Sequence, residues 1–545
     1  MPHDRAPAPP PRRSSPPAAA SGALLPLGLT HARLDAARRE FAAVVGAQNL
    51  YFDAMDRDSY RDKFAIDDAR HRPLGAIAPL TAEEVQQIVR VAAKAGIPLW
   101  PISRGKNLGY GGSAPMLSGS IVLDLSRMKK IEVDVDNATV LVEPGVGFYD
   151  LYDHLRTNNI PLWLSTPANS WGSVIGNALD RGVGYTPYGE NTSKLCGLEV
   201  VLADGDLVRT GMGAIKGSST WGLYRYGFGP AWDQMFVQSN FGVVTKANIW
   251  LMPEPESVLG MDVEFDRPDD LGPLIDALGP LRREGLLQAN PTIGNWMRAA
   301  AIVTRRSDWT DKPGALDDRV IDAIRKKFNM GWWGVGLRIF GREEVNKAIY
   351  PILEKAMSEL KPLSLKPSHW TRGQPVEANP NMGVPTTFPL QSANWHGAVG
   401  GHVGFSPILP QSGKLALEQF HRTYARYKEF GMDYQASFAF GERHLINVNA
   451  IQFNKSDPEM MKRVDPFLKA LIADARTRGY CEYRTHLDYM DAVADTYDFN
   501  DHALRRLNQR IKDALDPAGI IAPGKSGVWP SSHPEAKAAA RERRA

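Results

Sequence analysis

Helical and extended segments alternate along the first half of the chain without settling into a regular repeat. Residues 34–46 follow a helical period, and residues 81–96 open with Thr-Ala-Glu-Glu and end on glycine, as capped helices do. Short β-rich segments follow at tight spacing, over residues 97–103, 120–126, 130–136 and 138–145. This order predicts an α+β domain with one mixed sheet, because a parallel α/β sheet would place a helix between successive strands.

The chain is also too long for a single hydrophobic core. It has 545 residues, and chains beyond about 250–300 residues divide into domains. The pattern changes after Pro253-Glu254-Pro255, where long amphipathic helices begin to alternate with strands. The expected elements are helices over 269–287, 343–360 and 414–431, strands over 332–341 and 444–454, and a last helix over 503–515. We therefore expect a second, α/β-sandwich domain that covers the first.

Charge and cysteine content exclude several classes of protein. A formal charge of +3 from 64 basic and 61 acidic residues gives no reason to expect nucleic acid or a membrane surface as a partner. Cys196 and Cys481 cannot form a disulfide framework and lack metal-ligand spacing, so we expect buried thiols and no metal. No apolar stretch reaches the roughly 18 residues of a membrane span. Arg12-Arg13 suggests an export signal, but the surrounding prolines favour a disordered tail, and we expect a cytoplasmic protein.

Two glycine-rich segments, residues 104–112 and 171–177, each lie between regular elements. Glycine lets backbone N–H groups approach a phosphate closely, and Arg104 or Lys106 would add positive charge. Neither segment matches G-x-G-x-x-G after a first strand or G-x-x-x-x-G-K-[ST], so a Rossmann or P-loop site is unsupported. Judged alone, each segment is equally compatible with a simple tight turn.

Five sequence blocks together resemble one flavoprotein family. They are PISRGKNLGYGG, GNALDRGVGYTPYGE, NFGVVTKANIWLMP, EYRTH and DPAGIIAPGKSGVWP. They resemble the vanillyl-alcohol oxidase / para-cresol methylhydroxylase family, and most of all its eugenol oxidase and 4-alkylphenol oxidase branch. The resemblance implies a two-domain FAD-binding fold of the para-cresol methylhydroxylase (PCMH) type. Its expected parts are a tail at 1–27, an FAD-binding domain at 28–255, an α/β cap domain at 256–484, a C-terminal segment at 485–531 that completes the FAD domain, and a tail at 532–545.

The same resemblance implies which residues contact FAD. They are Ser103, Arg104, Gly105, Lys106, Asn107, Leu108, Gly109, Gly172, Ser173, Gly176, Asn177 and Arg181 around the pyrophosphate, Gly242, Val243 and Val244 along the adenosine, and Lys525 beside the flavin. His402, in a glycine-flanked turn, matches the flavin-linking position, which is a histidine in the oxidases and a tyrosine in the cytochrome-coupled methylhydroxylases. We therefore expect FAD to be covalently attached to His402 through its 8α-methyl group. Such an attachment should raise the flavin potential.

Tyr110, Tyr483 and Arg484 match the family's phenol-binding trio. A guanidinium stays charged at any working pH and two phenolic hydroxyls are directional donors, so together they favour a phenolate. A phenolate pushes electrons toward its para-benzylic carbon, from which hydride leaves for flavin N5 to give a para-quinone methide. Neighbouring side chains of a regular strand point to opposite faces, so the backbone must bend at Tyr483-Arg484 if both contact one ligand.

The chain departs from the family where a general base is expected. Ala168 stands where the oxidases carry an aspartate, and Ser437 stands where the methylhydroxylases carry an acidic residue. General bases contribute about 10²–10⁴-fold to rate. Three alternatives follow: a base from elsewhere, such as Glu442 or His444; substrates whose products need less help, such as benzylic alcohols or allylphenols; or flavin binding with little turnover.

The resulting prediction is an FAD-dependent oxidase of para-substituted phenols. Its expected substrates are 4-alkylphenols, 4-hydroxybenzyl alcohols or allylphenols, with O2 as acceptor and hydrogen peroxide as product. A cytochrome-coupled dehydrogenase or hydroxylase is the alternative, followed by a non-catalytic relative that binds flavin or a phenol. The resemblance also implies a homodimer or a larger homo-oligomer.

Overall fold

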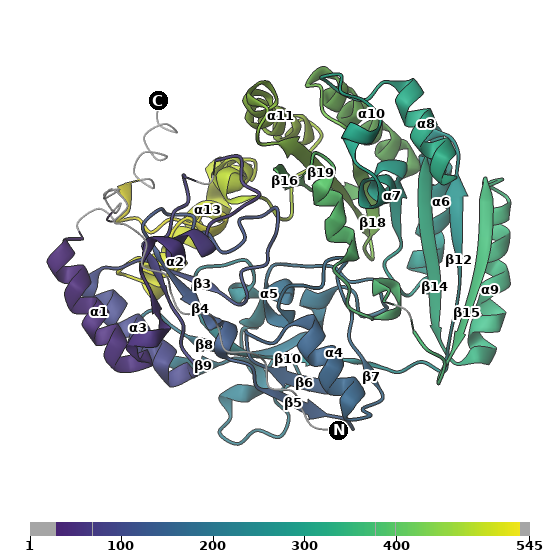
Figure 1. Cartoon of the computed structure of the whole chain (residues 1–545). Coiled ribbons are helices and arrows are strands. Elements are labelled where there is room, and N and C mark those ends of the chain that lie inside the picture. Colours follow the sequence, from purple (N-terminus) through teal and green to yellow (C-terminus); the bar gives the residue numbers. More distant parts are fainter. Residues whose placement is uncertain (1–24, 26–28, 68, 377, 398, 535–545) are drawn as a thin grey trace, which may run out of the picture.

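The computed structural model describes residue 25 and residues 29–67, 69–376, 378–397 and 399–534. The predicted tail at 1–27 lies outside this part except for residue 25, and the predicted tail at 532–545 lies outside it beyond residue 534. The chain forms two halves, which lie side by side in Figure 1. None of the helices in the described part combines the length and the apolar character needed to cross a lipid bilayer.

The first half contains two main sheets rather than the one mixed sheet expected. The smaller sheet has the order β1-β2-β4-β3, with β2, β4 and β3 parallel, whereas the order β5-β6-β10-β8-β9 is entirely antiparallel. A short pair, β11-β7, lies apart. The strands are β1 (Leu50–Tyr51), β2 (Gly75–Ile77), β3 (Leu99–Ile102), β4 (Ile121–Asp124), β5 (Ile131–Asp134), β6 (Thr139–Val142), β7 (Leu162–Trp163), β8 (Leu195–Val201), β9 (Leu207–Arg209), β10 (Val243–Trp250) and β11 (Met252–Pro253).

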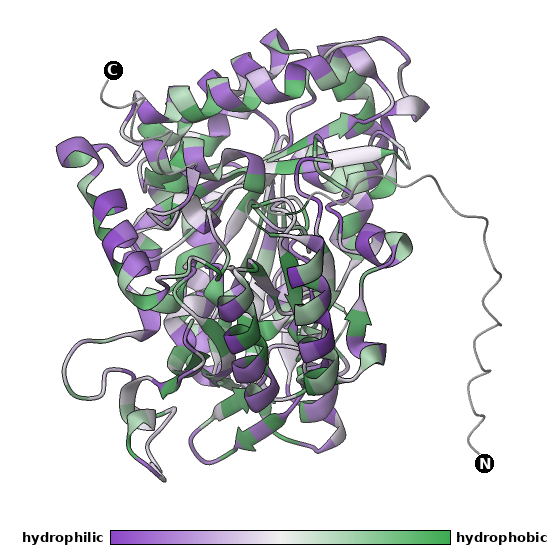
Figure 2. Cartoon of the chain, turned by 90° about the vertical axis from the view of Figure 1, so that its left-hand side faces the viewer, coloured by the Kyte–Doolittle hydropathy of each residue, from purple (hydrophilic) through white to green (hydrophobic). Residues whose placement is uncertain are grey.

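The helices of this half confirm the capping signals in the sequence. They are α1 (His31–Val45), α2 (Ala54–Ser59), α3 (Ala82–Ala95), α4 (Phe148–Thr157) and α5 (Val174–Leu179). Thr81 accepts a hydrogen bond from the Glu84 amide at the start of α3, and Gly96 ends the helix with a left-handed φ of 65°. The apolar face of α3, which includes Val85 and Ile88, is fully buried. Figure 2 shows the same alternation of hydrophobic and hydrophilic residues along the surface helices.

The second half is a large antiparallel sheet with helices against it. Its order is β15-β12-β14-β13-β18-β19-β16, and β17 pairs with β19. The strands are β12 (Ser257–Phe265), β13 (Thr292–Asn295), β14 (Trp333–Gly341), β15 (Ser364–Thr371), β16 (Gly400–Phe405), β17 (Ile408–Pro410), β18 (Ala436–Phe440) and β19 (His444–Asn454). The helices are α6 (Leu271–Arg283), α7 (Trp296–Val303), α8 (Asp318–Phe328), α9 (Glu343–Ser358), α10 (Gly413–Glu429) and α11 (Pro458–Arg476).

The last segment of the chain returns to the first half. It contains α12 (Met490–Asp495) and α13 (Phe499–Leu515), and Ile511 and Leu515 of α13 pack against the apolar core of the first half. The Leu99 amide donates to the Ile520 carbonyl at 2.7 Å, and the Ala522 amide donates to the Leu99 carbonyl at 2.8 Å. This segment therefore extends the parallel sheet beyond β3 and completes the first domain.

Candidate active site

A cavity of about 570 Å³ lies between the two halves. The first domain contributes both glycine-rich segments, residues 236–244 and the C-terminal segment. The cap contributes β13, β18, β19 and α7. Volumes of about 300–1,000 Å³ are usual for ligand pockets. The predicted residues that line it are Ser103, Gly105, Lys106, Asn107, Leu108, Tyr110, Ala168, Gly172, Ser173, Gly176, Asn177, Gly242, Val243, Val244, Ser437, Tyr483, Arg484 and Lys525.

The first glycine-rich segment is a loop whose backbone requires glycine. Gly105, Gly109, Gly111 and Gly112 all have φ between 56° and 117°, a region that is unfavourable for residues with a Cβ atom. The Gly112 amide donates to the Asn107 carbonyl at 3.0 Å and closes the turn that carries Tyr110. The loop thus presents backbone groups and the Tyr110 side chain to one cavity.

The second glycine-rich segment lies against the first. A Cβ on Gly176 would come within 2.4 Å of Ser103 Oγ, whereas a Cβ on Gly172 would meet nothing within 4 Å. Gly176 therefore allows the two segments to pack closely. Gly172 leaves space on the cavity side.

Asp180 connects three parts of the site and was missed from the sequence, although it lies inside a quoted block. Asn107 Nδ2 donates to it at 3.0 Å, Lys525 Nζ lies 3.4 Å away and Arg484 Nη1 lies 3.7 Å away. Burial would raise the pKa of Asp180, but Lys525 and Arg484 hold it below its ordinary value. A charged carboxylate therefore ties the glycine loop, the C-terminal segment and the Tyr-Arg pair together.

Tyr110, Tyr483 and Arg484 meet at one end of the cavity. The Arg484 Cζ atom lies 4.0 Å from the centre of the Tyr110 ring and 5.6 Å from the centre of the Tyr483 ring. Residues 483–484 form a bend rather than a strand, as the prediction requires if both side chains face one ligand. Burial raises the pKa of Tyr483 above its ordinary value although Arg484 opposes the shift, so this hydroxyl keeps its proton. The trio supplies a fixed positive charge and hydroxyl donors.

His402 lies in strand β16, opposite Gln452 of β19, and not in the expected turn. The glycines that flank His402 suggest a loop, but pairing of β16 with β19 holds the residue in an extended conformation. A Cβ on Gly109 would fall 2.5 Å from His402 Nδ1, so the imidazole packs directly against the glycine loop. Burial lowers the pKa of His402 to about 4. The imidazole is therefore neutral near pH 7, with a free nitrogen lone pair.

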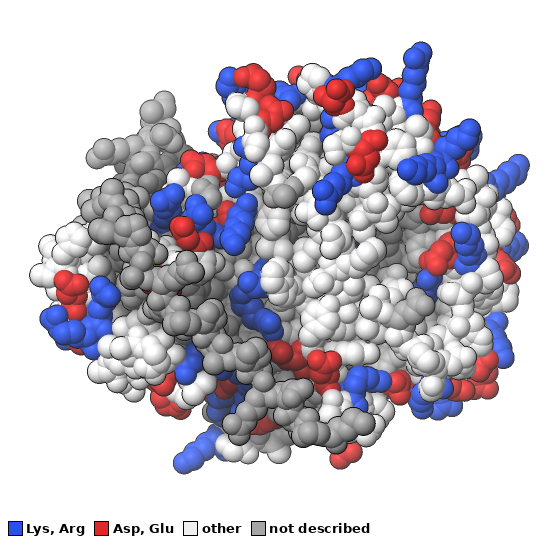
Figure 3. All heavy atoms as spheres, viewed as in Figure 1, with Lys and Arg blue, Asp and Glu red and all other residues white. Residues whose placement is uncertain are grey.

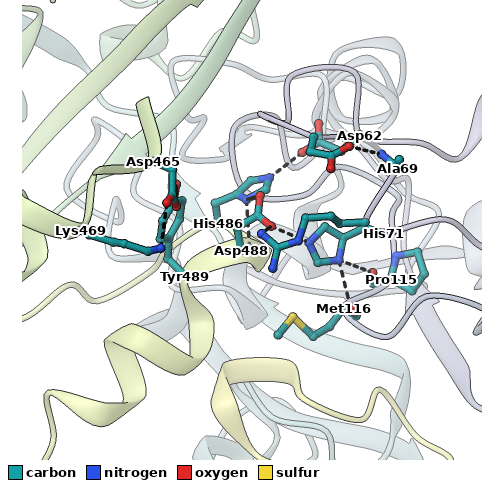
Figure 4. A network of polar contacts seen from close by, with 12 residues as sticks. Asp62, Ala69, His71, Pro115, Met116, Asp465, Lys469, His486, Asp488 and Tyr489 are labelled. Atoms are coloured by element: carbon teal, nitrogen blue, oxygen red, sulfur yellow. Dashed lines mark hydrogen bonds and ion pairs between the residues drawn. The ribbon is translucent and has the colours of Figure 1, made fainter. Parts of the chain in front are cut away.

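A buried network of carboxylates and imidazoles lies next to the segment that carries Tyr483 and Arg484 (Figure 4). His486 Nε2 lies 2.8 Å from Asp62 Oδ2, and its Nδ1 lies 3.3 Å from Asp488 Oδ2. Asp488 also contacts His71 Nε2 at 3.1 Å. Burial alone would lower the pKa of His486, but Asp488 and Asp62 raise it to about 9. The network fixes the segment that follows Arg484.

The positions without a carboxylate lie in the cap-facing part of the cavity. Ala168 and Asn169 line it, whereas the Ser170 hydroxyl donates to the Pro167 carbonyl and is turned away. Ser437 Oγ accepts a hydrogen bond from Arg298 Nη1 at 2.7 Å, and Arg298 Nη2 donates to the Tyr185 hydroxyl at 3.1 Å. Neither Arg298 nor Tyr185 was identified from the sequence.

Several other expected residues lie outside the cavity lining. Arg104 forms an ion pair with Asp150 at 2.7 Å, and the exposed Arg181 follows α5 with a left-handed φ of 52°. Gly109 and His402 contact each other just behind the lining. Glu442 and His444 are also absent from the lining, so the structure does not support either of them as the replacement base.

The cavity fits a dinucleotide such as FAD. Gly172 offers open space for a ligand. Within the described residues, Asn240 Oδ1, Gln435 Oε1 and Arg484 Nε are buried without hydrogen-bond partners, and all three residues line the cavity. Buried polar atoms without partners are uncommon, so these three indicate a polar ligand. Glycine-rich backbone and Lys106 would hold the phosphates, and Lys525 the ring end.

Comparison with known families defines the class. An FAD-binding domain family matches residues 73–211, and the C-terminal domain family of FAD-linked oxidases matches residues 415–526. The protein is thus an FAD-dependent oxidoreductase, with an FAD-binding domain and a cap as expected from the sequence.

Individual relatives define the family. The flavoprotein subunit of 4-cresol dehydrogenase (hydroxylating) from Pseudomonas putida is 35% identical over 93% of this chain and 98% of its own length. The structure of 4-ethylphenol oxidase from Gulosibacter chungangensis with isoeugenol has 35% identity and a TM-score of 0.87, and the match covers 93% of this chain and 99% of that one. The structure of p-cresol methylhydroxylase with bound substrate has 34% identity and a TM-score of 0.87 over the same shares. The chain belongs to the PCMH-type family of FAD-dependent oxidoreductases. Its place in the eugenol oxidase branch stays a prediction.

Proposed function

We propose that this enzyme oxidises para-substituted phenols at the benzylic carbon, with 4-alkylphenols as its first substrate class. The convergence of Tyr110, Tyr483 and Arg484 on one cavity carries this proposal. The names of the relatives, which refer to 4-cresol and 4-ethylphenol, point the same way. The 4-hydroxybenzyl alcohols and allylphenols share the same phenol end and are included in the proposal.

The trio would act by stabilising the phenolate of the substrate. Burial would lower the pKa of Arg484, but the charged Asp180 and a hydrogen bond to Tyr110 raise it above its ordinary value, so Arg484 remains charged. Tyr483 stays protonated and can donate a hydrogen bond to the phenolate oxygen. Asp180 fixes the guanidinium at 3.7 Å. Bound FAD supplies the acceptor for the hydride that leaves the benzylic carbon, and the substrate becomes a para-quinone methide.

The fate of the quinone methide depends on a cavity without a carboxylate at the expected positions. Ala168 and Ser437 offer no base, and the alternatives Glu442 and His444 do not line the cavity. We infer that water attacks the quinone methide without general-base assistance. Proton loss from the side chain, which gives an alkene, then competes with hydration.

We also propose that His402 carries FAD covalently through the 8α-methyl group. The neutral imidazole, packed against Gly109 behind the cavity, supports this assignment. Acid precipitation of the purified enzyme should leave the yellow colour in the pellet, and a His402→Ala variant should release it. Complete release from the unmodified enzyme would overturn the assignment.

The electron acceptor is proposed to be O2, because His402 stands where the oxidases of the family carry histidine. Peroxide formation under air, compared with cytochrome c reduction, distinguishes this from the dehydrogenase alternative. The expected domain boundaries, a homo-oligomer and a cytoplasmic location also remain proposals. Limited proteolysis, gel filtration and cell fractionation test them.

The decisive experiment is anaerobic mixing of the enzyme with 4-ethylphenol, 4-hydroxybenzyl alcohol and 4-allylphenol. Loss of the oxidised flavin absorbance is the expected result. Anisole analogues, which cannot form a phenolate, serve as the matched control. If none of the phenols bleaches the flavin, the protein is a non-catalytic relative and the proposed function falls.

A further inference from the structure

Arg298 occupies an unusual position in the cap. It lies in α7, and its side chain crosses β13 at Gly294, where an added Cβ would come within 3.0 Å of Arg298 Cδ. Beyond this crossing the guanidinium reaches Ser437 of β18 at 2.7 Å and the Tyr185 hydroxyl at 3.1 Å. The fold thus directs a guanidinium into the cavity through a gap in side-chain cover.

This guanidinium has hydroxyl partners but no counter-ion. Among the described residues, no Asp or Glu oxygen lies within 4.0 Å of it. Glu264 lines the adjoining chamber, but it accepts a hydrogen bond from the Gly331 amide at 2.6 Å and forms no ion pair with Arg298. By contrast, Arg484 and Lys525 both face Asp180. A cation in a cavity of this kind favours an anionic ligand, because removal from water is otherwise uncompensated.

Hydroxyl groups around the guanidinium can donate further hydrogen bonds to a ligand that Arg298 binds. Gly294 and Thr292 lie opposite Ser437 and Ala439 in the sheet register, so Thr292 and Ser437 are diagonal neighbours on one face. The Thr292 hydroxyl is buried without a hydrogen-bond partner among the described residues. One guanidinium fork and several hydroxyls are the groups that bind a carboxylate.

The position of Arg298 suits the para side chain of a bound phenol. Arg298, Thr292, Tyr185 and Ala168 line both the main cavity and an adjoining chamber of about 320 Å³. Tyr185 lines the same cavity as Tyr110, Tyr483 and Arg484, and its hydroxyl accepts a hydrogen bond from Arg298 Nη2 at 3.1 Å. If the phenol oxygen lies at the trio, the para side chain extends away from it into the same cavity that Arg298 lines.

We propose that Arg298, together with Ser437, Thr292 and Tyr185, binds a carboxylate on the para side chain. The favoured substrates are then 4-hydroxyphenyl alkanoic acids, in which a phenolate and a carboxylate occupy opposite ends of one cavity. This inference rests on the proposed oxidation of para-substituted phenols, and it adds the chemical class of the side chain.

The test compares acids with neutral analogues of equal size. The holoenzyme is mixed anaerobically with 4-hydroxyphenylacetate, 3-(4-hydroxyphenyl)propanoate, the amide of each acid, and 4-propylphenol. The measured quantity is the ratio of flavin-reduction efficiency for an acid to that for its amide. We expect a ratio of about 10–100 for at least one chain length, the size of a charge-assisted hydrogen-bond pair. Arg298→Gln should bring that ratio to about 1, and Arg298→Lys should give an intermediate value.

Arg305→Gln is the matched control, because Arg305 is an exposed arginine just beyond α7 and does not line the cavity. It should leave the ratio unchanged. A wild-type ratio at or below 1 for both acids, or a ratio that Arg298→Gln does not reduce, would overturn the inference. If 4-propylphenol reduces the flavin while the acids show no advantage, this inference alone fails. If no phenol reduces the flavin, the proposed function fails first. In that case, spectral titration with the redox-inert 4-hydroxybenzoate, against 4-hydroxybenzamide, still measures carboxylate preference.

Discussion

Replacing Asp180 by asparagine removes a carboxylate that faces two cations in the interior of the site. Its oxygens lie 3.7 Å from Arg484 and 3.4 Å from Lys525. At an effective dielectric of about 20, each attraction amounts to about 4–5 kcal/mol. Desolvation offsets much of this attraction, and removal of one partner from a buried pair typically costs about 3–5 kcal/mol. Asparagine preserves the shape and can still accept from Asn107. We therefore expect a loss of about 3 kcal/mol in the free energy of unfolding.

Urea unfolding of the holoenzyme measures this loss as a lower midpoint with an unchanged slope. The effect also has a predicted sign with pH. Because the pKa of Asp180 is lowered in the folded state, its contribution is present above the ordinary pKa of about 4 and is lost as the pH falls further. Glu359→Gln is the control, since Glu359 pairs with Lys355 at 3.9 Å on the surface and should change stability by less than about 1 kcal/mol. A difference below about 1 kcal/mol between the two variants would refute the reasoning.

Three further predictions concern the phenol end, the missing base and the network behind the site. Tyr483→Phe removes one donor to the phenolate and should slow flavin reduction by 4-ethylphenol about 10- to 100-fold in stopped-flow mixing; an unchanged rate would exclude Tyr483 from phenolate binding. Ala168→Asp should raise the share of hydrated product over alkene, measured by chromatography after turnover, and identical product ratios would contradict the account of an unassisted water attack. The pKa of His486 is raised to about 9, so its contribution to stability is full below its ordinary pKa of about 6.5 and is lost as the pH rises through 9, on the order of 3 kcal/mol in total. His486→Gln should flatten this decline in urea unfolding between pH 7 and 10, and parallel curves would argue against the assignment.

Local chemistry explains what the sequence could predict of the fold. Thr81 and Gly96 specify both ends of α3, and the strand predicted over residues 444–454 has the same bounds as β19. Local signals could not predict which strands pair with each other when the strands are far apart in the sequence. The split of the first half into two sheets depends on partners distant in the chain, such as Ile121 beside Leu99 and Ala247 beside Val142.

The same limit applies to the site. The glycine segments and the phenolate trio could be recognised because each lies in a compact sequence block. Arg298 could not, because its role depends on crossing Gly294 to reach a strand about 140 residues away. Asp180 stood inside a recognised block, but its importance depends on charges that come from the end of the chain.

Charges of both signs are interspersed over the face of the molecule shown in Figure 3. Some oppositely charged pairs lie inside the molecule instead. Lys512 Nζ, for example, is fully buried and donates to Asp516, to the Asn240 carbonyl and to the Ile521 carbonyl. It holds the C-terminal segment against the first domain.

That closing segment has a consequence for how the enzyme is made. The Leu99 pairing and the Lys525–Asp180 contact both require residues beyond 519. Residues 520–525 must therefore leave the ribosome before the FAD-binding domain can close. We therefore expect FAD to bind only after this segment has folded against the first domain. A truncation that removes residues 520–525 should therefore abolish FAD binding.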